Sequence, residues 1–252
     1  MDTGDRYWPT FLEVFESLPR QGPGSRACTA RALALCRELP DEPIIIDFGC
    51  GAGAQTLDLA ALTDGRITAL DSHPPFVERL SSTLAGRGLS PRVRVVLGDM
   101  AHPPFRPGGA DLIWSEGAAY SIGLENALHI WHRLLRPGGY LAYTEAVWLR
   151  SDPPAEARAF WEKEYPQIGD VPSNLALASR CGYGIAGHFV LPGETWWDAF
   201  YTPMEARIRE LREKYAGDAE ATAALGSIAA EAELHRRFGD SYGYAFFVLR
   251  RT

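Results

Sequence analysis

The sequence predicts an α/β protein with a mostly parallel sheet, and three observations indicate this fold class. Apolar stretches of strand length alternate with amphipathic helical stretches from residue 43 onward. The first apolar stretch turns into a helix through glycines at positions 49, 51 and 53. An aspartate stands at the end of each of the first three predicted strands, at positions 47, 71 and 99. Strand–helix alternation at this spacing implies right-handed crossovers, so the strands lie parallel.

Length and composition limit the function classes. At 252 residues the chain has the length of one large α/β domain, and its hydrophobic content of 46% predicts a full core. The formal net charge is −7, which argues against a nucleic-acid partner because such binding needs a concentrated basic face. No apolar run approaches the roughly 18 residues that cross a membrane.

The cysteines and histidines predict no metal site. The four cysteines show no CxxC pairing and no signal peptide precedes them, so we expect reduced thiols and a cytoplasmic location. His129 and His132 stand three apart on a predicted helix without a third ligand in the sequence, so we expect ordinary packed or surface histidines.

The elements follow in order. Two helices, over residues 7–18 and from 25 to about 39, precede the first strand and are predicted to form a lid or brace on the sheet. Strands are predicted at 44–48, 66–70, 92–97, 110–115 and 139–145, with helices at 54–63, 74–86 and 124–135 between them. After residue 150 we expect helices at 154–165 and 173–180, a strand at 184–191, helices at 203–215 and 218–237, and a last strand at 244–250.

The glycine turn predicts a nucleotide-type cofactor at the carboxyl end of the first strand. Such a turn points unpaired backbone N–H groups and a helix N-terminus at one spot, and glycine permits close approach of a ligand. Gly49, Gly51 and Ala54 also satisfy the looser dinucleotide pattern, and Asp71 lies near the distance at which an acid meets a ribose. The glycines alone therefore leave an NAD-type cofactor open.

The three strand-end acids favour a cationic nucleoside over a dinucleotide. A carboxylate at Asp47 needs a cationic or amino-bearing partner, and it would repel a pyrophosphate. Asp71 is placed to accept from both ribose hydroxyls. Asp99 offers a carboxylate to an adenine amino group, and Met100 offers a thioether to the adenine ring.

Four ordered stretches then resemble the signatures of class I S-adenosylmethionine-dependent methyltransferases, closest to the small-molecule ubiquinone/menaquinone-biosynthesis type. They are Asp47-Phe-Gly-Cys-Gly-Ala-Gly53, Asp71 after Ile67-Thr-Ala-Leu70, Gly98-Asp99-Met100, and Leu134-Leu-Arg-Pro-Gly-Gly-Tyr-Leu141. The resemblance covers residues 40–147. It implies a Rossmann-like seven-stranded sheet of order 3-2-1-4-5-7-6 with the last strand antiparallel, helices on both faces, and S-adenosyl-L-methionine as cofactor.

The resemblance also implies a cofactor-binding set. Asp47 and the glycine loop would hold the methionine moiety, Asp71 the ribose, and Asp99 with Met100 the adenine. The whole set is Asp47, Gly49, Cys50, Gly51, Gly53, Gln55, Asp71, Ser72, His73, Asp99, Met100 and Ser115. Cys50 is expected to fill space in the loop and not to act as a nucleophile.

Methyl transfer from a sulfonium is an in-line displacement, so alignment and water exclusion matter more than any one catalytic residue. Alignment is worth on the order of 7–11 kcal/mol, whereas a general base adds about 10²–10⁴-fold. Glu116, after the fourth strand, is the leading candidate for orienting or deprotonating an acceptor; a structural contact is the equal alternative. Tyr120 and Glu145 are secondary candidates.

Aromatic residues outside the cofactor half predict the acceptor site. We expect an apolar or aromatic small-molecule acceptor, or an amine held by cation–π contacts. Packing of the lid helices is the alternative for each aromatic residue. The predicted pocket residues are Tyr7, Arg20, Gln21, Glu145, Trp148, Trp196 and Trp197.

The sequence as a whole predicts a single domain over residues 1–252, with a helical lid or brace at 1–40, a cofactor-binding half at 41–150 and an acceptor-side elaboration at 151–252. The predicted function is methyl transfer to a small molecule, without nucleic-acid or membrane partners, and a homodimer is compatible with it. An NAD-type oxidoreductase and a non-catalytic cofactor-binding module are the alternatives.

Overall fold

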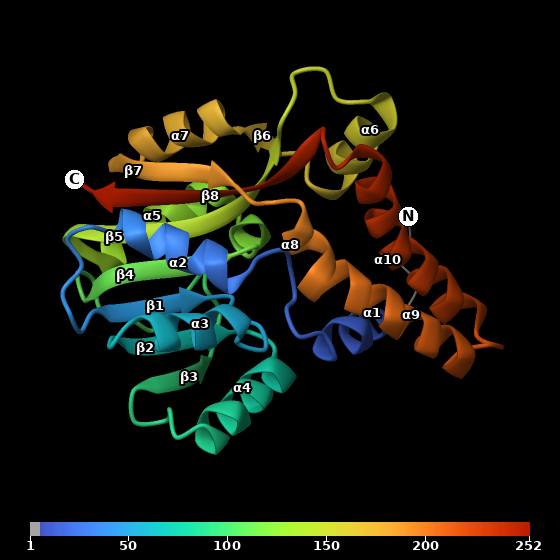
Figure 1. Ribbon diagram of the computed structural model, residues 1–252, viewed down its shortest axis with the longest axis horizontal. Helices are drawn as coiled ribbons and strands as arrows, with labels where there is room; N and C mark the ends of the chain where they lie inside the picture. The colour runs from blue at the N-terminus through green and yellow to red at the C-terminus, as the bar shows by residue number, and fades with distance from the viewer. Residues whose placement is uncertain (1–5) are drawn as a thin grey trace.

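A computed structural model describes residues 6–252, and its central feature is one mixed sheet (Figure 1). The strand order is β3-β2-β1-β4-β5-β8-β7. Only β8 runs antiparallel to its neighbours in that path, and it lies between β5 and β7. The strands are β1 (Ile44–Phe48), β2 (Arg66–Asp71), β3 (Val93–Leu97), β4 (Ala110–Glu116), β5 (Leu135–Trp148), β7 (Tyr183–Val190) and β8 (Tyr242–Arg251). This confirms the predicted order, with β7 and β8 as its sixth and seventh strands.

Two details of the sheet differ from the prediction. A two-residue strand, β6 (Gly169–Asp170), pairs with the end of β5 and has too little pattern to be predicted. The fifth strand also begins four residues earlier than predicted. Its pairing with β4 shifts between Ala110 and Leu112, so the Pro137-Gly138-Gly139 turn is absorbed as an irregularity within the strand. Gly138, with φ +76°, makes that irregularity possible.

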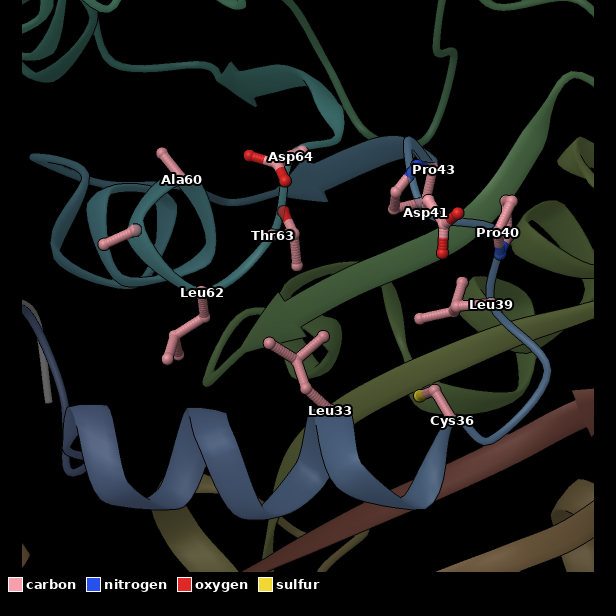
Figure 2. Close-up of a pocket in the computed structure, with 11 residues that line it drawn as sticks. Leu33, Cys36, Leu39, Pro40, Asp41, Pro43, Ala60, Leu62, Thr63 and Asp64 are labelled. Carbon is pink, nitrogen blue, oxygen red and sulfur yellow. The ribbon is translucent and has the colours of Figure 1, made fainter.

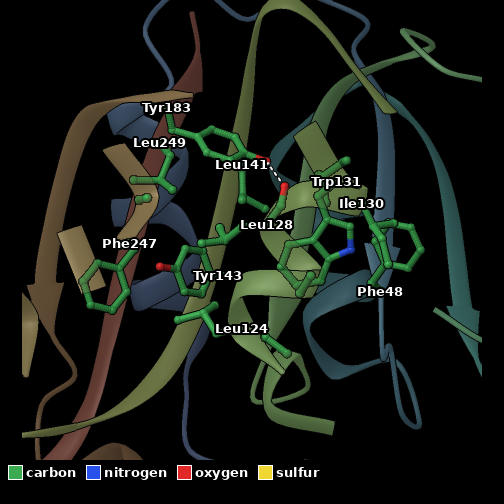
Figure 3. Packing of buried hydrophobic residues seen from close by; sticks show 14 of the residues in the cluster. Phe48, Leu124, Leu128, Ile130, Trp131, Leu141, Tyr143, Tyr183, Phe247 and Leu249 are labelled. Atoms are coloured by element: carbon green, nitrogen blue, oxygen red, sulfur yellow. Dashed lines mark hydrogen bonds between the residues drawn. The ribbon is translucent and has the colours of Figure 1, made fainter. Parts of the chain in front are cut away.

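Helices cover both faces of the sheet. One face packs against α2 (Arg26–Leu35), α3 (Ala54–Leu62) and α4 (Pro74–Gly86). The other packs against α5 (Leu124–Leu134) and α7 (Val171–Arg180), where Phe48 stacks on Trp131 and Tyr143 stacks on Phe247 (Figure 3). The Tyr183 hydroxyl donates a 2.9 Å hydrogen bond to the Leu128 carbonyl, which ties β7 to α5 across this core.

A third cluster of helices lies beyond the carboxyl ends of the parallel strands (Figure 1). We call it the lid bundle. It consists of α1 (Tyr7–Glu16), α6 (Ala155–Glu164), α8 (Glu194–Trp196), a π-helical turn η2 (Trp197–Tyr201), α9 (Thr202–Lys214) and α10 (Ala219–Phe238). Of the two predicted N-terminal helices, α1 joins this bundle whereas α2 braces the sheet. Because α8 and η2 precede α9 without a break, the helical segment starts at Glu194, nine residues before the predicted helix at 203.

No helix within residues 6–252 combines the length and apolar character needed to span a bilayer. Two hollows lie along α3. One, of about 590 Å³, is lined in part by Arg20, Ala54 and Asp58, next to the glycine turn. The other, of about 420 Å³, is lined by Leu33, Leu39, Thr63 and neighbours, at the end of the sheet where β1 begins (Figure 2). It is therefore at the opposite end of β1 from the loop.

Candidate cofactor and acceptor site

The glycine loop between β1 and α3 adopts a backbone that side chains rarely permit. Gly49, Gly51 and Gly53 have φ values of +66°, +53° and +91°. A Cβ at Gly53 would overlap the Leu80 side chain, and one at Gly49 would overlap Ala118. The loop thus needs glycine for its conformation and for its neighbours. The buried Gln55 amide donates to the Cys50 carbonyl at 3.2 Å, and this hydrogen bond joins the loop to the first turn of α3.

Asp47 is the most unusual group in the site because it is a fully buried carboxylate. The Thr56 hydroxyl donates to its Oδ2 at 2.5 Å, whereas its Oδ1 accepts no hydrogen bond from residues 6–252. Burial raises the pKa of Asp47 to about 8. An ammonium group of a ligand would satisfy Oδ1, which is the partner that the sequence predicts for this acid.

The other predicted adenosine contacts lie around the same loop. Asp71 accepts hydrogen bonds from the amides of Gly51 at 2.8 Å and His73 at 2.9 Å. Met100 places its terminal methyl next to Gly49. Asp99 is exposed and accepts from the Ala101 amide at 2.8 Å, which holds its pKa below the usual range. These positions are compatible with ribose and adenine contacts, whose assignment remains a prediction.

Ser72, His73, Cys50 and Ser115 complete the predicted set. His73 lies 2.7 Å from Glu16 and so connects α1 to the end of β2. Ser72 is exposed, whereas Ser115 is fully buried and its hydroxyl has no hydrogen-bond partner in residues 6–252. The Cys50 thiol is buried within the loop, in agreement with a space-filling role.

The loop after α1 closes directly over the glycine turn. Gln21 accepts a 2.9 Å hydrogen bond from the Ala52 amide, while its own amide donates to the carbonyls of Phe15 and Leu18. A Cβ at Gly51 would lie 2.6 Å from Gln21 Oε1. Gln21 thus joins the glycine loop to α1, and its predicted place in the acceptor pocket stays a prediction.

Arg20 and Glu116 form a buried ion pair beside this contact. Arg20 Nη1 lies 2.7 Å from Glu116 Oε2, and the two side chains are 7% and 4% exposed. The Trp114 indole donates to Glu116 Oε1 at 2.8 Å, and Arg20 also pairs with Asp58 at 3.1 Å. Both Glu116 oxygens are thus engaged by the protein. This arrangement favours the structural alternative for Glu116 over the predicted acceptor base.

The two secondary candidates, Tyr120 and Glu145, do converge. Glu145 is buried, and its charge contributes to raising the pKa of Tyr120, after burial and Glu231. Tyr165 stands between them: its ring lies 6.1 Å from Tyr120, and its hydroxyl lies near Glu145. Sequence reasoning missed Glu231, because an acid in the helix over residues 219–238 resembles its solvated neighbour Glu233.

The predicted pocket aromatics mostly form the core of the lid bundle. Trp196 is 2% exposed and stacks on His235 at 4.2 Å between ring centroids. Trp148 packs edge-on against Tyr242, and Tyr7 stacks on Phe11. Trp197 contacts the same His235 at 6.1 Å. Packing, the alternative reading, accounts for these contacts.

His129 and His132, expected to be ordinary packed or surface histidines, have different neighbours. His132 lies 3.2 Å from the Gly182 carbonyl, whereas His129 approaches Cys181 at 3.9 Å with Glu125 alongside. The potential ligand atoms of Glu125, His129 and Cys181 lie within 4.8 Å of one another. The sequence concealed this third partner, since Cys181 is 52 residues away along the chain.

Comparisons with known proteins agree with the fold and with the glycine loop. Residues 45–139 match the family model described as "Methyltransferase domain". The chain is 28% identical over 118 residues to a sterol 24-C-methyltransferase of Pneumocystis carinii, covering 46% of this chain and 31% of that protein. It is 31% identical over 141 residues to a malonyl-[acyl-carrier protein] O-methyltransferase of Dechloromonas aromatica, covering 53% and 50%. The chain thus spans about a third to a half of the length of these curated relatives.

Two solved structures extend the likeness to nearly the whole chain. A Geobacter sulfurreducens methyltransferase in complex with S-adenosyl-L-homocysteine has a TM-score of 0.82 at 19% identity, over 97% of this chain and 98% of that one. The [4+2]-cyclase SpnF has a TM-score of 0.75 at 20% identity, over 98% and 93%. At such identities the likeness establishes the fold, and the cyclase illustrates that this fold serves more than one reaction.

Proposed function

We propose that the chain, which belongs to the class I S-adenosylmethionine-dependent methyltransferases, transfers a methyl group to a small-molecule acceptor. Bound at the glycine loop, S-adenosyl-L-methionine would supply an electrophilic methyl carbon and a neutral thioether leaving group. The observation that carries the proposal is Asp47, whose buried Oδ1 lacks a donor in residues 6–252 at the point where the amino group of the methionine moiety would lie.

The same carboxylate argues against the dinucleotide alternative. A pyrophosphate at this turn would meet the negative charge of Asp47, and Arg20, the arginine beside the loop, is already paired with Glu116 and Asp58. The ammonium and sulfonium of S-adenosyl-L-methionine would instead lie near three acids, Asp47, Asp71 and Glu116. The charges of Glu116 and Asp71 also contribute to the raised pKa of Asp47.

The protein's own contribution is to hold the reactants and exclude water. Gln21 joins α1 to the glycine loop, and the Arg20–Glu116 pair fixes the intervening segment to the end of β4. These two contacts hold the segment after α1 against the glycine loop, so the segment covers the cofactor side of the site. Closure of this kind pre-aligns an acceptor and removes bulk water, which supplies most of the barrier reduction for a displacement that needs no covalent intermediate.

Titration calorimetry with S-adenosyl-L-homocysteine and NAD tests the proposal. We expect S-adenosyl-L-homocysteine to bind and NAD not to bind. Asp47→Asn should weaken S-adenosyl-L-homocysteine by about 10- to 100-fold, since hydrogen bonds to charged groups are worth roughly 1.5–3 kcal/mol. Asp64→Asn, at an exposed acid beside the hollow in Figure 2, is the matched control. Tight NAD binding without S-adenosyl-L-homocysteine binding would overturn the proposal.

A protein that binds the cofactor without transferring methyl groups is the remaining alternative. Incubation with methyl-labelled S-adenosyl-L-methionine and a broad acceptor mixture separates the two. Label appearing in an acceptor supports transfer, whereas cofactor binding without any labelled product favours the non-transferring alternative.

A further inference from the structure

Two carboxylates and three tyrosine hydroxyls gather at the carboxyl ends of β4 and β5. We call this set the acid–tyrosine cluster; it consists of Glu145, Glu231, Tyr120, Tyr165 and Tyr244. Its members come from β5, α10, the 3-10 turn η1 (Ala119–Ile122), the loop after α6 and β8. Five separate elements therefore contribute side chains whose charges and hydroxyls influence one another.

Glu145 lacks the partner that a buried carboxylate requires. The residue is 4% exposed, and its Oε1 accepts a 3.1 Å hydrogen bond from the Ala146 amide. Its Oε2 has no donor within bonding distance among residues 6–252, although the Tyr165 hydroxyl lies nearby. A buried anion in this condition costs several kcal/mol unless a ligand supplies a cation or a proton.

Glu231 adds a second acid to the same place. The Tyr201 hydroxyl donates to it at 2.7 Å, and burial raises its pKa above the usual range. The charges of Glu145 and Glu231 both contribute to the raised pKa of Tyr120 and to that of Tyr244, so the two acids face the same two hydroxyls. Within residues 6–252, neither acid forms a salt bridge with a lysine, arginine or histidine. The cluster thus holds two carboxyl groups without a cationic partner among residues 6–252, beside three tyrosine rings.

The cluster lies next to residues that contact the cofactor loop, and one of its members is exposed to solvent. Gly117, directly after β4, lies against the Tyr244 ring: a Cβ added at this glycine would lie 3.4 Å from the ring edge. The next residue, Ala118, touches Gly49 of the glycine loop. Tyr120 is 53% exposed, so one wall of the cluster faces solvent. A molecule entering beside Tyr120 would meet the acids next to the bound cofactor.

We propose that the acid–tyrosine cluster is the acceptor subsite and that it selects an amine, held as its ammonium ion by Glu145, Glu231 and the faces of the tyrosine rings. This proposal rests on the methyl-transfer function above. In the reaction, the ammonium gives one proton to the Glu145 carboxylate. The amine lone pair then forms the N–C bond to the methyl carbon while the S–C bonding pair stays on sulfur, which gives a methylated ammonium and a neutral thioether. Glu145 afterwards returns the proton to solvent.

Matched probe pairs that differ in charge test the selection. The pairs are choline with 3,3-dimethylbutan-1-ol, 2-phenylethylamine with 2-phenylethanol, and hexylamine with hexan-1-ol, each titrated into protein saturated with S-adenosyl-L-homocysteine. We expect the charged member of at least one pair to bind at least tenfold more tightly. With methyl-labelled cofactor, we expect the primary amines to be labelled and the alcohols not.

Variants locate the selection. Glu145→Gln and Glu231→Gln should each remove most of the preference for the charged probe while leaving S-adenosyl-L-homocysteine affinity within about twofold. Glu233→Gln, an exposed acid two residues further along α10, is the control and should keep the preference. Tyr120→Phe retains the aromatic ring and should also keep the preference for the charged probe. It therefore shows whether a substitution within the subsite disturbs its folding.

The outcomes separate this proposal from the methyl-transfer function. Binding of S-adenosyl-L-homocysteine with no charge preference in any pair, or labelling of the alcohols over the amines, overturns the amine subsite and leaves the cofactor function standing. Failure to bind S-adenosyl-L-homocysteine overturns both.

Discussion

Arg20 Nη1 lies 2.7 Å from Glu116 Oε2, and this pair joins the segment after α1 to the carboxyl end of β4 across 96 residues of sequence. Both side chains are almost completely buried. Asp58 on α3 holds the second guanidinium nitrogen, and the Trp114 indole holds the second Glu116 oxygen. The pair is therefore the anchor that keeps Gln21 on the glycine loop.

Removing one partner of this pair should be costly. Arg20→Ala leaves the Glu116 carboxylate buried without its cation, and breaking a buried pair in this way costs about 3–5 kcal/mol. We expect that loss in the free energy of urea unfolding, together with weaker S-adenosyl-L-homocysteine binding because Gln21 is released. Arg150→Ala, which removes an exposed pair with Asp152, should leave both quantities unchanged. Equal effects of the two substitutions would contradict the anchor.

Glu116→Gln distinguishes an anchor from a base. If Glu116 is an anchor, the Glu116→Gln variant should have a lower free energy of unfolding and a higher KM for S-adenosyl-L-methionine, and its kcat should stay within a few-fold of the parent's. As a base, it should yield a loss of about 10²–10⁴-fold in kcat with the KM unchanged. We expect the first result, because both carboxylate oxygens already accept hydrogen bonds from the protein. Steady-state kinetics with a labelled acceptor checks it.

Cofactor binding should release a proton from Asp47. With a pKa raised to about 8 by burial, the free protein holds this carboxyl mostly protonated at pH 7. An ammonium placed at Oδ1 lowers that pKa, so about one proton leaves, and affinity rises with pH from 6 to about 8 and then levels off. Calorimetry with S-adenosyl-L-homocysteine in buffers of different ionisation enthalpy measures the release.

The control is Asp47→Asn, which has no proton to lose and should show no buffer dependence. Binding of the parent at pH 7 without proton release would mean that no cation meets Asp47.

The cofactor half was predictable because its signals are local. Asp47, Gly49 and Gly53 are adjacent in sequence and belong to one strand–turn–helix, so spacing alone places them together. The strand order was also predictable, because short crossovers leave few topologies. The periodicities at 74–86 and 124–135 gave helix boundaries within one residue.

The acceptor side was much less predictable, since its contacts join distant segments. Glu116 points toward Arg20, 96 residues earlier, and so its role as an anchor has no sequence signal. Glu231 and Glu233 have similar neighbours in the chain, and only the orientation of α10 makes the first half-buried and leaves the second exposed. Trp196 looked like a pocket wall, but the π-helical turn that follows it directs its ring against His235.

Alanine at position 51 should weaken cofactor binding. The new Cβ would lie 2.6 Å from Gln21 Oε1 in a backbone with φ +53°, so the loop or the Gln21 contact must shift. We expect Gly51→Ala to lower S-adenosyl-L-homocysteine affinity by more than tenfold in calorimetry. Gly226→Ala, in the middle of α10 with open space around its Cα, should bind normally. It should also raise the unfolding free energy by about 0.5–1 kcal/mol through helix propensity. Normal binding by Gly51→Ala would remove the loop from the cofactor site.

His235 should make the protein sensitive to acid. Burial among Trp196, Tyr201 and Tyr242 lowers the pKa of His235 to about 4, against about 6.5 when unfolded. A lowered pKa means that the unfolded chain takes up the proton first, so stability falls as pH drops from about 6.5 toward 4. At pH 5 this amounts to about 2 kcal/mol. Comparison of urea unfolding for the parent and His235→Phe at pH 7.5 and 5.0 isolates this contribution. A difference between the two proteins that does not change with pH would contradict a buried neutral imidazole.

Binding of a permanently charged probe should follow the ionisation of Glu145. Burial raises the pKa of Glu145 to about 8, and it faces Tyr143 and Tyr165, with Tyr120, Tyr244 and Glu231 across the acid–tyrosine cluster. The tyrosine pKa values are all raised, so those hydroxyls stay neutral up to pH 9. Choline carries its charge at every pH, so its affinity reports only on the protein.

Because a raised acid pKa keeps Glu145 neutral at low pH, choline affinity should increase from pH 6 to pH 9 as the carboxylate forms. If only the ionised form binds, the gain approaches about 100-fold over that range. Titration must be done at saturating S-adenosyl-L-homocysteine, where Asp47 is already paired and does not contribute to the profile. Glu145→Gln should flatten the dependence, leaving at most a smaller slope from Glu231, whose pKa burial also raises. An equally steep profile in Glu145→Gln would assign the titration to Glu231 and remove Glu145 from the subsite.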